Sequence, residues 1–185
     1  MIEWLRTFNI LQESDLQQLQ TLLKPIKLLK GEHLEQEGKT SRQLCFLTNG
    51  ILRSYFTNDN GEPITNCIIF EKHWIAALTS FITQQPAQEN IQAIVDCELL
   101  ALDRNTLYTL YEENIRWANM GRVLIEKEFV EMEQRILAFQ KLPAKDRYER
   151  LLQEQPRLVQ QIPLQYLASY LGITPQHLSR LRRAS

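Results

Sequence analysis

The spacing of apolar residues divides the chain into three regions. Apolar positions three and four residues apart predict short amphipathic helices up to Pro25. From Ile26 to Leu102 short apolar runs alternate with turn residues such as Asn58–Gly61, a pattern typical of an antiparallel roll or barrel. After Asp103 the helical spacing returns. We therefore expect an α+β fold whose sheet lies in the first half of the chain.

A segment without proline, from Ile115 to Lys141, predicts one long helix. Within it, five apolar residues follow the alternating spacing of four and three residues that is typical of a heptad repeat. These residues are Ile125, Phe129, Met132, Ile136 and Phe139. Such a stripe favours pairing with the same helix of a second chain, so we expect a homodimer. The alternative is that the stripe packs on the β-roll of its own chain.

The end of the chain has the pattern of two short helices joined by a turn. The apolar face of the first helix would consist of Leu164, Leu167, Ala168 and Leu171. Gly172 is suited to the end of this helix because glycine tolerates positive φ. Thr174 can cap the second helix through its hydroxyl group, and Pro175 fits the first helical position. The pattern predicts a helix-turn-helix.

The second helix would bury Leu178 and Leu181 and turn polar and basic side chains outward. The early residues of such a helix reach base edges in the major groove of DNA, and arginines bind guanine or phosphates. We expect the DNA-binding residues to be Thr174, Gln176, His177, Ser179, Arg180, Arg182 and Arg183. The alternative is an ordinary helical hairpin that does not bind DNA.

The net charge of −1 over 185 residues conceals an uneven distribution. From Lys141 onward there are eight basic and three acidic residues, a net charge of +5, against 13 basic and 19 acidic residues, or −6, before it. The basic part is the part with the predicted helix-turn-helix. This distribution suits a protein that places one end on a polyanion.

Other features of the sequence argue against a membrane-spanning or secreted protein and against a disulfide or a metal cluster. The chain has no apolar run of roughly 20 residues, and its start lacks a basic segment followed by an apolar core. We therefore expect a cytoplasmic protein with no membrane partner. Cys45, Cys67 and Cys97 lie far apart in apolar or strand-like runs, which favours buried free thiols over a disulfide or a metal cluster.

The order of these regions resembles the Crp/Fnr family of bacterial transcription regulators. The resemblance extends over almost the whole chain and rests on the terminal helices and on five short motifs. These motifs are Lys30–Glu32, Gln36–Gly38, Leu47–Gly50, Asn60–Glu62 and Glu98–Leu102. The family relation implies a jelly-roll effector domain of the cyclic-nucleotide-binding type, a double-stranded β-helix. It also implies a dimerisation helix and DNA binding by the helix after Thr174.

The resemblance implies an effector domain at 1–114, a dimerisation helix at 115–141 and a helix-turn-helix domain at 142–185. The family usually adds a β-hairpin wing after the recognition helix, and we expect this wing to be absent here. The expected partners are double-stranded DNA with a palindromic operator, a second copy of the chain and an unknown small-molecule effector. RNA polymerase is a further candidate partner.

The residues that bind the ligand in this family are missing at the corresponding positions of this chain. Cyclic-nucleotide-binding members hold the ribose with a Gly-Glu pair and the phosphate with an Arg followed by Ser or Thr. These places fall on Ala76–Ala77 and Ala87–Gln88 here, and Glu89 would repel a phosphate. We therefore expect a degenerate pocket, formed by Ala76, Ala77, Ala87, Gln88 and Glu89, that has lost cyclic-nucleotide binding. No cysteine precedes Cys45 to hold the iron–sulfur cluster of the oxygen-sensing members, so we expect no cofactor.

A different class remains as the alternative, a cupin-like ligand-binding protein or enzyme whose helical tail does not bind DNA. A metal-dependent cupin needs two or three histidines and a carboxylate around one metal. The three histidines are His33, His73 and His177, and the last lies in the predicted recognition helix. Because no metal triad and no catalytic motif can be assembled from the sequence, we expect neither a metal site nor catalysis. His33 and His73 are interpreted as surface or hydrogen-bonded residues.

Overall fold

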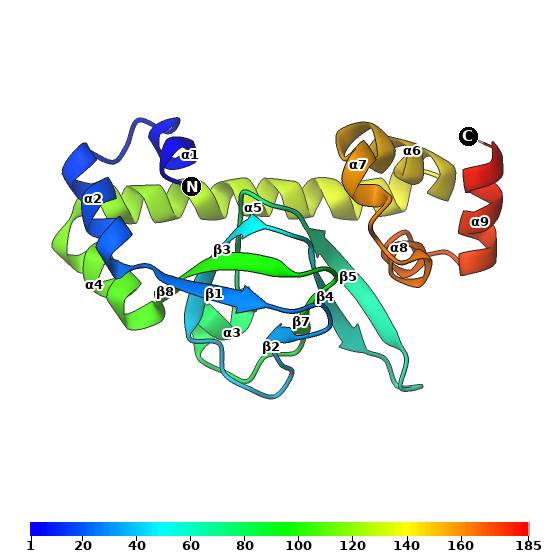
Figure 1. Ribbon diagram of the computed structural model, residues 1–185, viewed down its shortest axis with the longest axis horizontal. Helices are drawn as coiled ribbons and strands as arrows, with labels where there is room; N and C mark the ends of the chain where they lie inside the picture. Colours follow the sequence, from blue (N-terminus) through cyan, green and yellow to red (C-terminus); the bar gives the residue numbers. More distant parts are fainter. Residues whose placement is uncertain (185) are drawn as a thin grey trace.

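The computed structural model describes residues 1–184, in which a central β-roll lies beside one long helix (Figure 1). Short helices gather at both ends of this helix, α5. The helices are α1 (Ile2–Arg6), α2 (Glu13–Leu22), α3 (Leu78–Thr83), α4 (Arg104–Glu113), α5 (Ile115–Lys141), α6 (Ala144–Glu154), α7 (Pro156–Val159), α8 (Leu164–Tyr170) and α9 (Pro175–Ala184). The strands are β1 (Lys24–Leu28), β2 (His33–Glu35), β3 (Gln43–Asn49), β4 (Leu52–Thr57), β5 (Pro63–Ile69), β6 (His73–Ile75), β7 (Asn90–Ala93) and β8 (Cys97–Asp103).

The strands of residues 1–184 form two four-stranded sheets, in the orders β1-β8-β3-β6 and β2-β7-β4-β5. Every pairing is antiparallel, which confirms the antiparallel β-structure that the sequence predicts for the first half of the chain. Apolar side chains that alternate along the strands, including Leu47, Leu52, Ile91 and Leu99, fill the space between the two sheets. Gly50 (φ +108°) makes the turn from β3 to β4, where a Cβ atom would lie 2.7 Å from the Asp96 carbonyl oxygen.

One end of the molecule is a helical cap on the roll. Helices α1, α2 and α4 and the first turns of α5 share an apolar core there with Phe81 and Leu102. Within this cap the buried Asp15 carboxylate accepts hydrogen bonds from Arg116 Nε at 2.7 Å and from Arg116 Nη2 at 2.9 Å. Asn114 Nδ2 donates to the same carboxylate at 3.1 Å. The ion pair therefore ties α2 to the beginning of α5.

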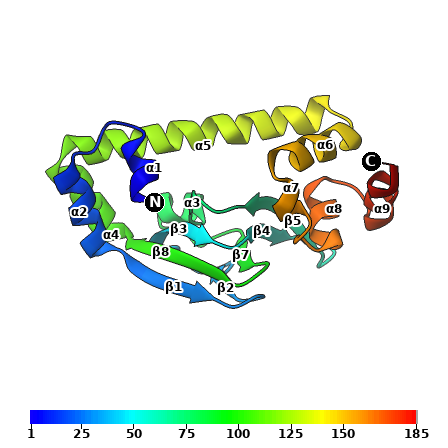
Figure 2. The same ribbon diagram turned by 45° about the horizontal axis from the view of Figure 1, so that its top comes forward.

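Helix α5 has the range that the sequence predicts, Ile115–Lys141. The Asn114 side chain caps it by accepting a hydrogen bond from the Arg116 backbone N–H at 3.0 Å. Its buried residues are Trp117 and Met120, both in the first two turns. The rest of the helix runs alongside the roll toward the C-terminal helices (Figure 2). No helix in residues 1–184 combines the length and the apolar character that crossing a membrane requires.

At the other end, the C-terminal helices pack directly on the roll. Ile51, Ile68 and Ile94 of the roll share one apolar core with side chains of α6 to α9. The Thr65 backbone N–H of β5 donates to Ser169 Oγ of α8 at 2.9 Å. Since β5 is the last strand of its sheet, this bond covers part of an edge that would otherwise lie open.

The ion pair between Asp15 and Arg116 predicts a specific loss of stability. Hydrogen bonding from Arg116 lowers the pKa of Asp15, so the charged carboxylate stabilises the folded state above its ordinary pKa of 3.8. Asp15→Asn should lower Tm at neutral pH by roughly 5 °C or more. The difference from the wild type should disappear as the pH falls through the lowered pKa, because the wild-type carboxylate then becomes protonated as well.

Thermal unfolding followed by circular dichroism at several pH values measures this effect. Asp59→Asn is the matched control, because Asp59 lies exposed in the turn between β4 and β5. Equal Tm values for the two variants at neutral pH would show that the ion pair does not anchor α5.

Candidate functional site

The turn between α8 and α9 has the local structure that the sequence predicts. Gly172 adopts φ +67°; its N–H donates to the Ser169 carbonyl, and the Ile173 N–H donates to the Ala168 carbonyl, each at 3.0 Å. These two bonds form a Schellman motif, which ends α8. Thr174 Oγ1 then accepts from the His177 backbone N–H at 3.2 Å, as the cap of α9. The direction of α9 relative to α8 is therefore set by residues of the turn between the two helices.

Helix α9 presents its polar side chains to solvent. Leu178 is fully buried and Leu181 is half-buried, so these residues hold the inner face. Six of the seven predicted DNA-binding residues are exposed and Ser179 is half-buried. The exposed residues are Thr174, Gln176, His177, Arg180, Arg182 and Arg183. Figure 1 shows α9 at the end of the molecule, beyond α8. The structure thus brings the predicted residues onto one accessible element.

The heptad stripe of α5 is exposed in the single chain. Its five side chains, Ile125, Phe129, Met132, Ile136 and Phe139, have between 39% and 59% of their surface accessible. Val130 and Leu137 on the neighbouring face are also exposed. The stripe is therefore not buried on the β-roll of its own chain. A row of exposed large apolar side chains is unusual on a monomeric surface.

The positions assigned to the degenerate pocket lie on both sides of α3. Ala76 and Ala77 come directly before this helix and Ala87 follows it; all three are buried. Ala77 and Ala87 both belong to the core between the two sheets. Gln88 is exposed and Glu89 is half-buried. The segments that would hold a ligand are thus brought together, but their buried positions carry methyl groups.

A second carboxylate adds to the negative charge of this region. Glu35 on β2 is half-buried and accepts a hydrogen bond from Ser41 Oγ at 2.5 Å. Burial raises the pKa of Glu35, and the charge of Glu89 raises this pKa further. The charge of Glu89 therefore acts on the half-buried carboxylate of Glu35.

The buried Arg53 of β4 packs between two aromatic rings. Its guanidinium group lies 4.2 Å from the centre of the Tyr55 ring and 3.5 Å from that of the Tyr166 ring. Gln92 Oε1 accepts hydrogen bonds from Arg53 Nε at 3.1 Å and from Nη2 at 2.7 Å. Arg53 is therefore engaged in holding α8 on the sheet. No local pattern predicts this contact, because Tyr166 lies more than a hundred residues further along the chain.

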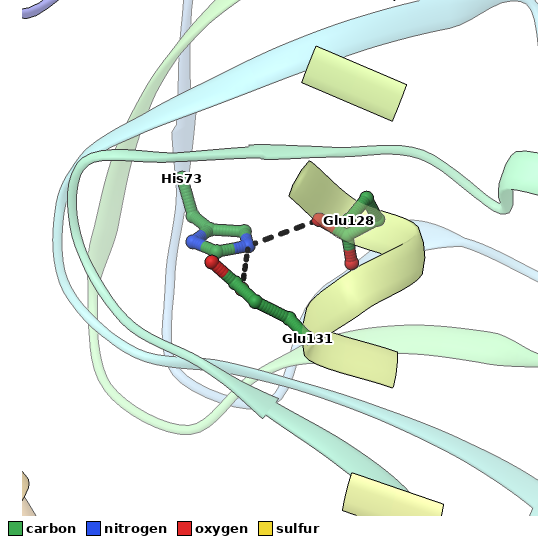
Figure 3. A group of neighbouring side chains, drawn as sticks. All are labelled: His73, Glu128 and Glu131. Carbon is green, nitrogen blue, oxygen red and sulfur yellow. Dashed lines mark hydrogen bonds and ion pairs between the residues drawn. The ribbon is translucent and has the colours of Figure 1, made fainter. Parts of the chain in front are cut away.

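The three histidines lie on β2, β6 and α9 and do not form a cupin-type centre. His33 Nε2 is hydrogen-bonded to the Tyr55 hydroxyl at 2.9 Å. His73 Nε2 lies 3.3 Å from Glu128 Oε2 and 3.7 Å from Glu131 Oε2, so β6 meets the middle of α5 (Figure 3). The hydrogen bond with Glu128 raises the pKa of His73. Sequence reasoning did not identify this group, since its members lie on separate elements.

Comparison with known proteins supports the assignment of the fold. Residues 25–114 match the family described as "Cyclic nucleotide-binding domain". No curated protein sequence matches the chain. FixK2 from Bradyrhizobium japonicum is similar in structure, with a TM-score of 0.77 and 16% sequence identity, over 88% of this chain and 83% of that one.

Two further solved structures have the same fold. CLP from Xanthomonas campestris, described as a c-di-GMP responsive global regulator, has a TM-score of 0.73 and 13% identity over 94% of this chain and 91% of that one. A regulator of the Crp/Fnr family from Eubacterium rectale has a TM-score of 0.72 and 19% identity over 96% of this chain and 84% of that one. Residues 25–114 thus match the cyclic nucleotide-binding domain family, and the fold of the chain is similar to that of these solved regulators.

Proposed function

We propose that the protein is a dimeric, DNA-binding transcription regulator of the Crp/Fnr type. In this proposal residues 1–114 are the effector domain, 115–141 the dimerisation helix and 142–185 the DNA-binding domain. The observation that carries it is the exposed polar and basic face of α9, a helix held at a defined angle by the Schellman turn and the Thr174 cap. The similarity in fold to known regulators supports the same function.

Two kinds of DNA contact are expected along α9. The first turns of a recognition helix face the floor of the major groove, so Gln176, Ser179 and Arg180 should contact base edges. Residues toward the end of the helix lie closer to the sugar–phosphate backbone. His177, Arg182 and Arg183 should therefore bind phosphates.

Dimerisation would provide a partner for the exposed stripe of α5. Burying a large apolar side chain contributes about 1.5–3 kcal/mol, and the five residues of the stripe lie along one line of the helix. A two-fold pairing of α5 helices would bury the same residues on both chains. It would also place two α9 helices on one DNA molecule.

The effector domain should not respond to cyclic nucleotides. A cyclic phosphate needs a cation or several N–H donors, whereas the region around Ala77 and Ala87 contains the carboxylates of Glu35 and Glu89. Arg53, the buried arginine of the roll, is held between Tyr55 and Tyr166. We infer that the domain keeps the fold of its family without the family's ligand chemistry.

Isothermal titration calorimetry with cyclic AMP and cyclic GMP tests this inference. We expect no binding below a Kd of about 1 mM, because the charged contact to the phosphate is absent. A micromolar Kd for either nucleotide would show that other residues have taken over the family's role.

Light scattering at micromolar concentration tests the dimer. The wild type should have about twice the chain mass of 21.8 kDa, and Phe129→Glu should be monomeric, since it places two charges in the centre of the interface. Leu29→Glu is the control, because Leu29 is exposed and belongs to the connection between β1 and β2. A wild type that remains at 21.8 kDa, or a Phe129→Glu variant that remains dimeric, would contradict the role of the stripe.

Two arginine variants test DNA binding, with fluorescence anisotropy on the preferred DNA site and on a scrambled duplex over a series of salt concentrations. Arg180→Ala should cost about 1–3 kcal/mol on the preferred site and relax specificity at one base position per half-site. Arg183→Ala should weaken binding to both duplexes alike and reduce the slope of log K against log salt by about one. If both variants behave alike on both duplexes, α8 and α9 form a helical hairpin that does not contact base edges.

A further inference from the structure

The side chains of His73, Glu128 and Glu131 meet between the roll and α5. The histidine begins β6, and the two glutamates lie three residues apart on α5, so they share one face of the helix. Figure 3 shows the imidazole and both carboxylates directed toward one another. One ligand atom from each residue lies within 4.8 Å of the other two. The group therefore converges from two separate elements rather than from one acidic run.

The distances within this group suit a metal ion. Nitrogen and oxygen ligands lie about 2.1 Å from a bound transition metal, so neighbouring ligands lie about 3.0–3.4 Å apart in octahedral and tetrahedral sites. His73 Nε2 lies 3.3 Å from Glu128 Oε2 and 3.7 Å from Glu131 Oε2. His73 Nε2 thus lies close to the ligand spacing for both carboxylates, and rotation of the two exposed glutamate side chains would bring their oxygens around one cation.

The group lies where it can affect the contact between α5 and the roll. In residues 1–184, α5 beyond Gly121 forms hydrogen bonds or ion pairs with the roll through this group and through Arg135 Nη2, which donates to Asn66 Oδ1 at 3.3 Å. No side chain in that part of the helix is fully buried. Few hydrogen bonds and ion pairs within residues 1–184 therefore join the roll to the middle of α5, and a bound ion would add to them.

We propose that His73, Glu128 and Glu131 form a binding site for a divalent transition-metal cation, with Zn²⁺ as the preferred ion. An imidazole ligand disfavours Mg²⁺ and Ca²⁺, which take oxygen ligands, while two carboxylates neutralise the charge of a divalent ion. Lys127 Nζ lies 3.6 Å from Glu131 and is exposed, so it can move away when the ion binds. Water molecules complete the coordination sphere from the exposed side.

A cation at this site would join β6 to the dimerisation helix. It would thereby supply the effector domain with an input that is independent of the lost nucleotide pocket. This regulatory consequence rests on the proposed function, whereas binding of the cation does not.

Calorimetric titration of the full chain with ZnCl₂ and with MgCl₂, in a buffer that does not chelate metals, tests the site. The wild type should bind one Zn²⁺ per chain at this site and bind Mg²⁺ far more weakly. His73→Ala should weaken Zn²⁺ binding roughly 100-fold, and Glu128→Gln and Glu131→Gln at least about tenfold each. The matched controls are His33→Ala, which removes an imidazole elsewhere, and Glu133→Gln, which removes a charge from another position of α5. Both should stay within about twofold of the wild type.

The absorption spectrum of bound Co²⁺ provides a second measurement, because it reports the ligands directly. The spectrum should change in Glu128→Gln and Glu131→Gln, which keep the shape of the side chain and the fold. The proposal is overturned if the wild type binds no Zn²⁺, or if the three site variants bind it as the controls do. The group would then be an ion pair between a protonated histidine and two carboxylates. Since no DNA is present in these titrations, their failure is distinct from a failure of the proposed DNA binding.

Discussion

The architecture depends on the way in which α5 is anchored at one end. Its first two turns are fixed by the Asp15–Arg116 ion pair and by Trp117, which is buried in the helical cap. Gly121 allows α4 to approach closely, because a Cβ atom there would lie 2.4 Å from the Tyr111 hydroxyl oxygen. Beyond this point the helix runs beside the roll, and its side chains are half-buried or exposed. The apolar stripe therefore stays exposed, and the helix connects the cap to the C-terminal helices.

The C-terminal helices are held in place by an apolar core that they share with the roll. Because Ile51 and Ile68 pack against α6 to α8, the position of α8 depends on the sheet. Tyr166 lies on Arg53, and Ser169 accepts a hydrogen bond from the edge strand β5. A change in the position of β4 or β5 would consequently be transmitted to α8 and, through the rigid turn, to α9. The roll and the exposed basic helix are physically coupled even in a single chain.

The elements that the sequence predicts well are those determined by local interactions. The turn at Gly172 and the cap at Thr174 depend on neighbouring backbone groups, so residue type suffices to place them. The range of α5 follows from the absence of proline and from the heptad spacing. The positions of the strands follow from the turn residues that separate them. Helix α3 was not predicted, because its six residues are too few to show a helical period.

What the sequence does not predict depends on tertiary structure. Arg53 contacts Tyr166, and His73 meets Glu128 across 55 positions of the chain. The exposed polar face of α9 was predictable, whereas these contacts between distant elements were not, because no local pattern records them. The residues that couple the roll to α5 and α8 therefore became visible only in the folded chain.

In the proposed function, two copies of α9 bind DNA together, as the paired recognition helices of a regulator. The most direct measurement is the selection of bound duplexes from a random-sequence library by the purified protein at low salt, followed by sequencing. An inverted repeat whose half-site centres lie about one helical turn apart is the predicted result. A library without any enriched sequence, or with an enriched sequence that is not repeated, would contradict the claim.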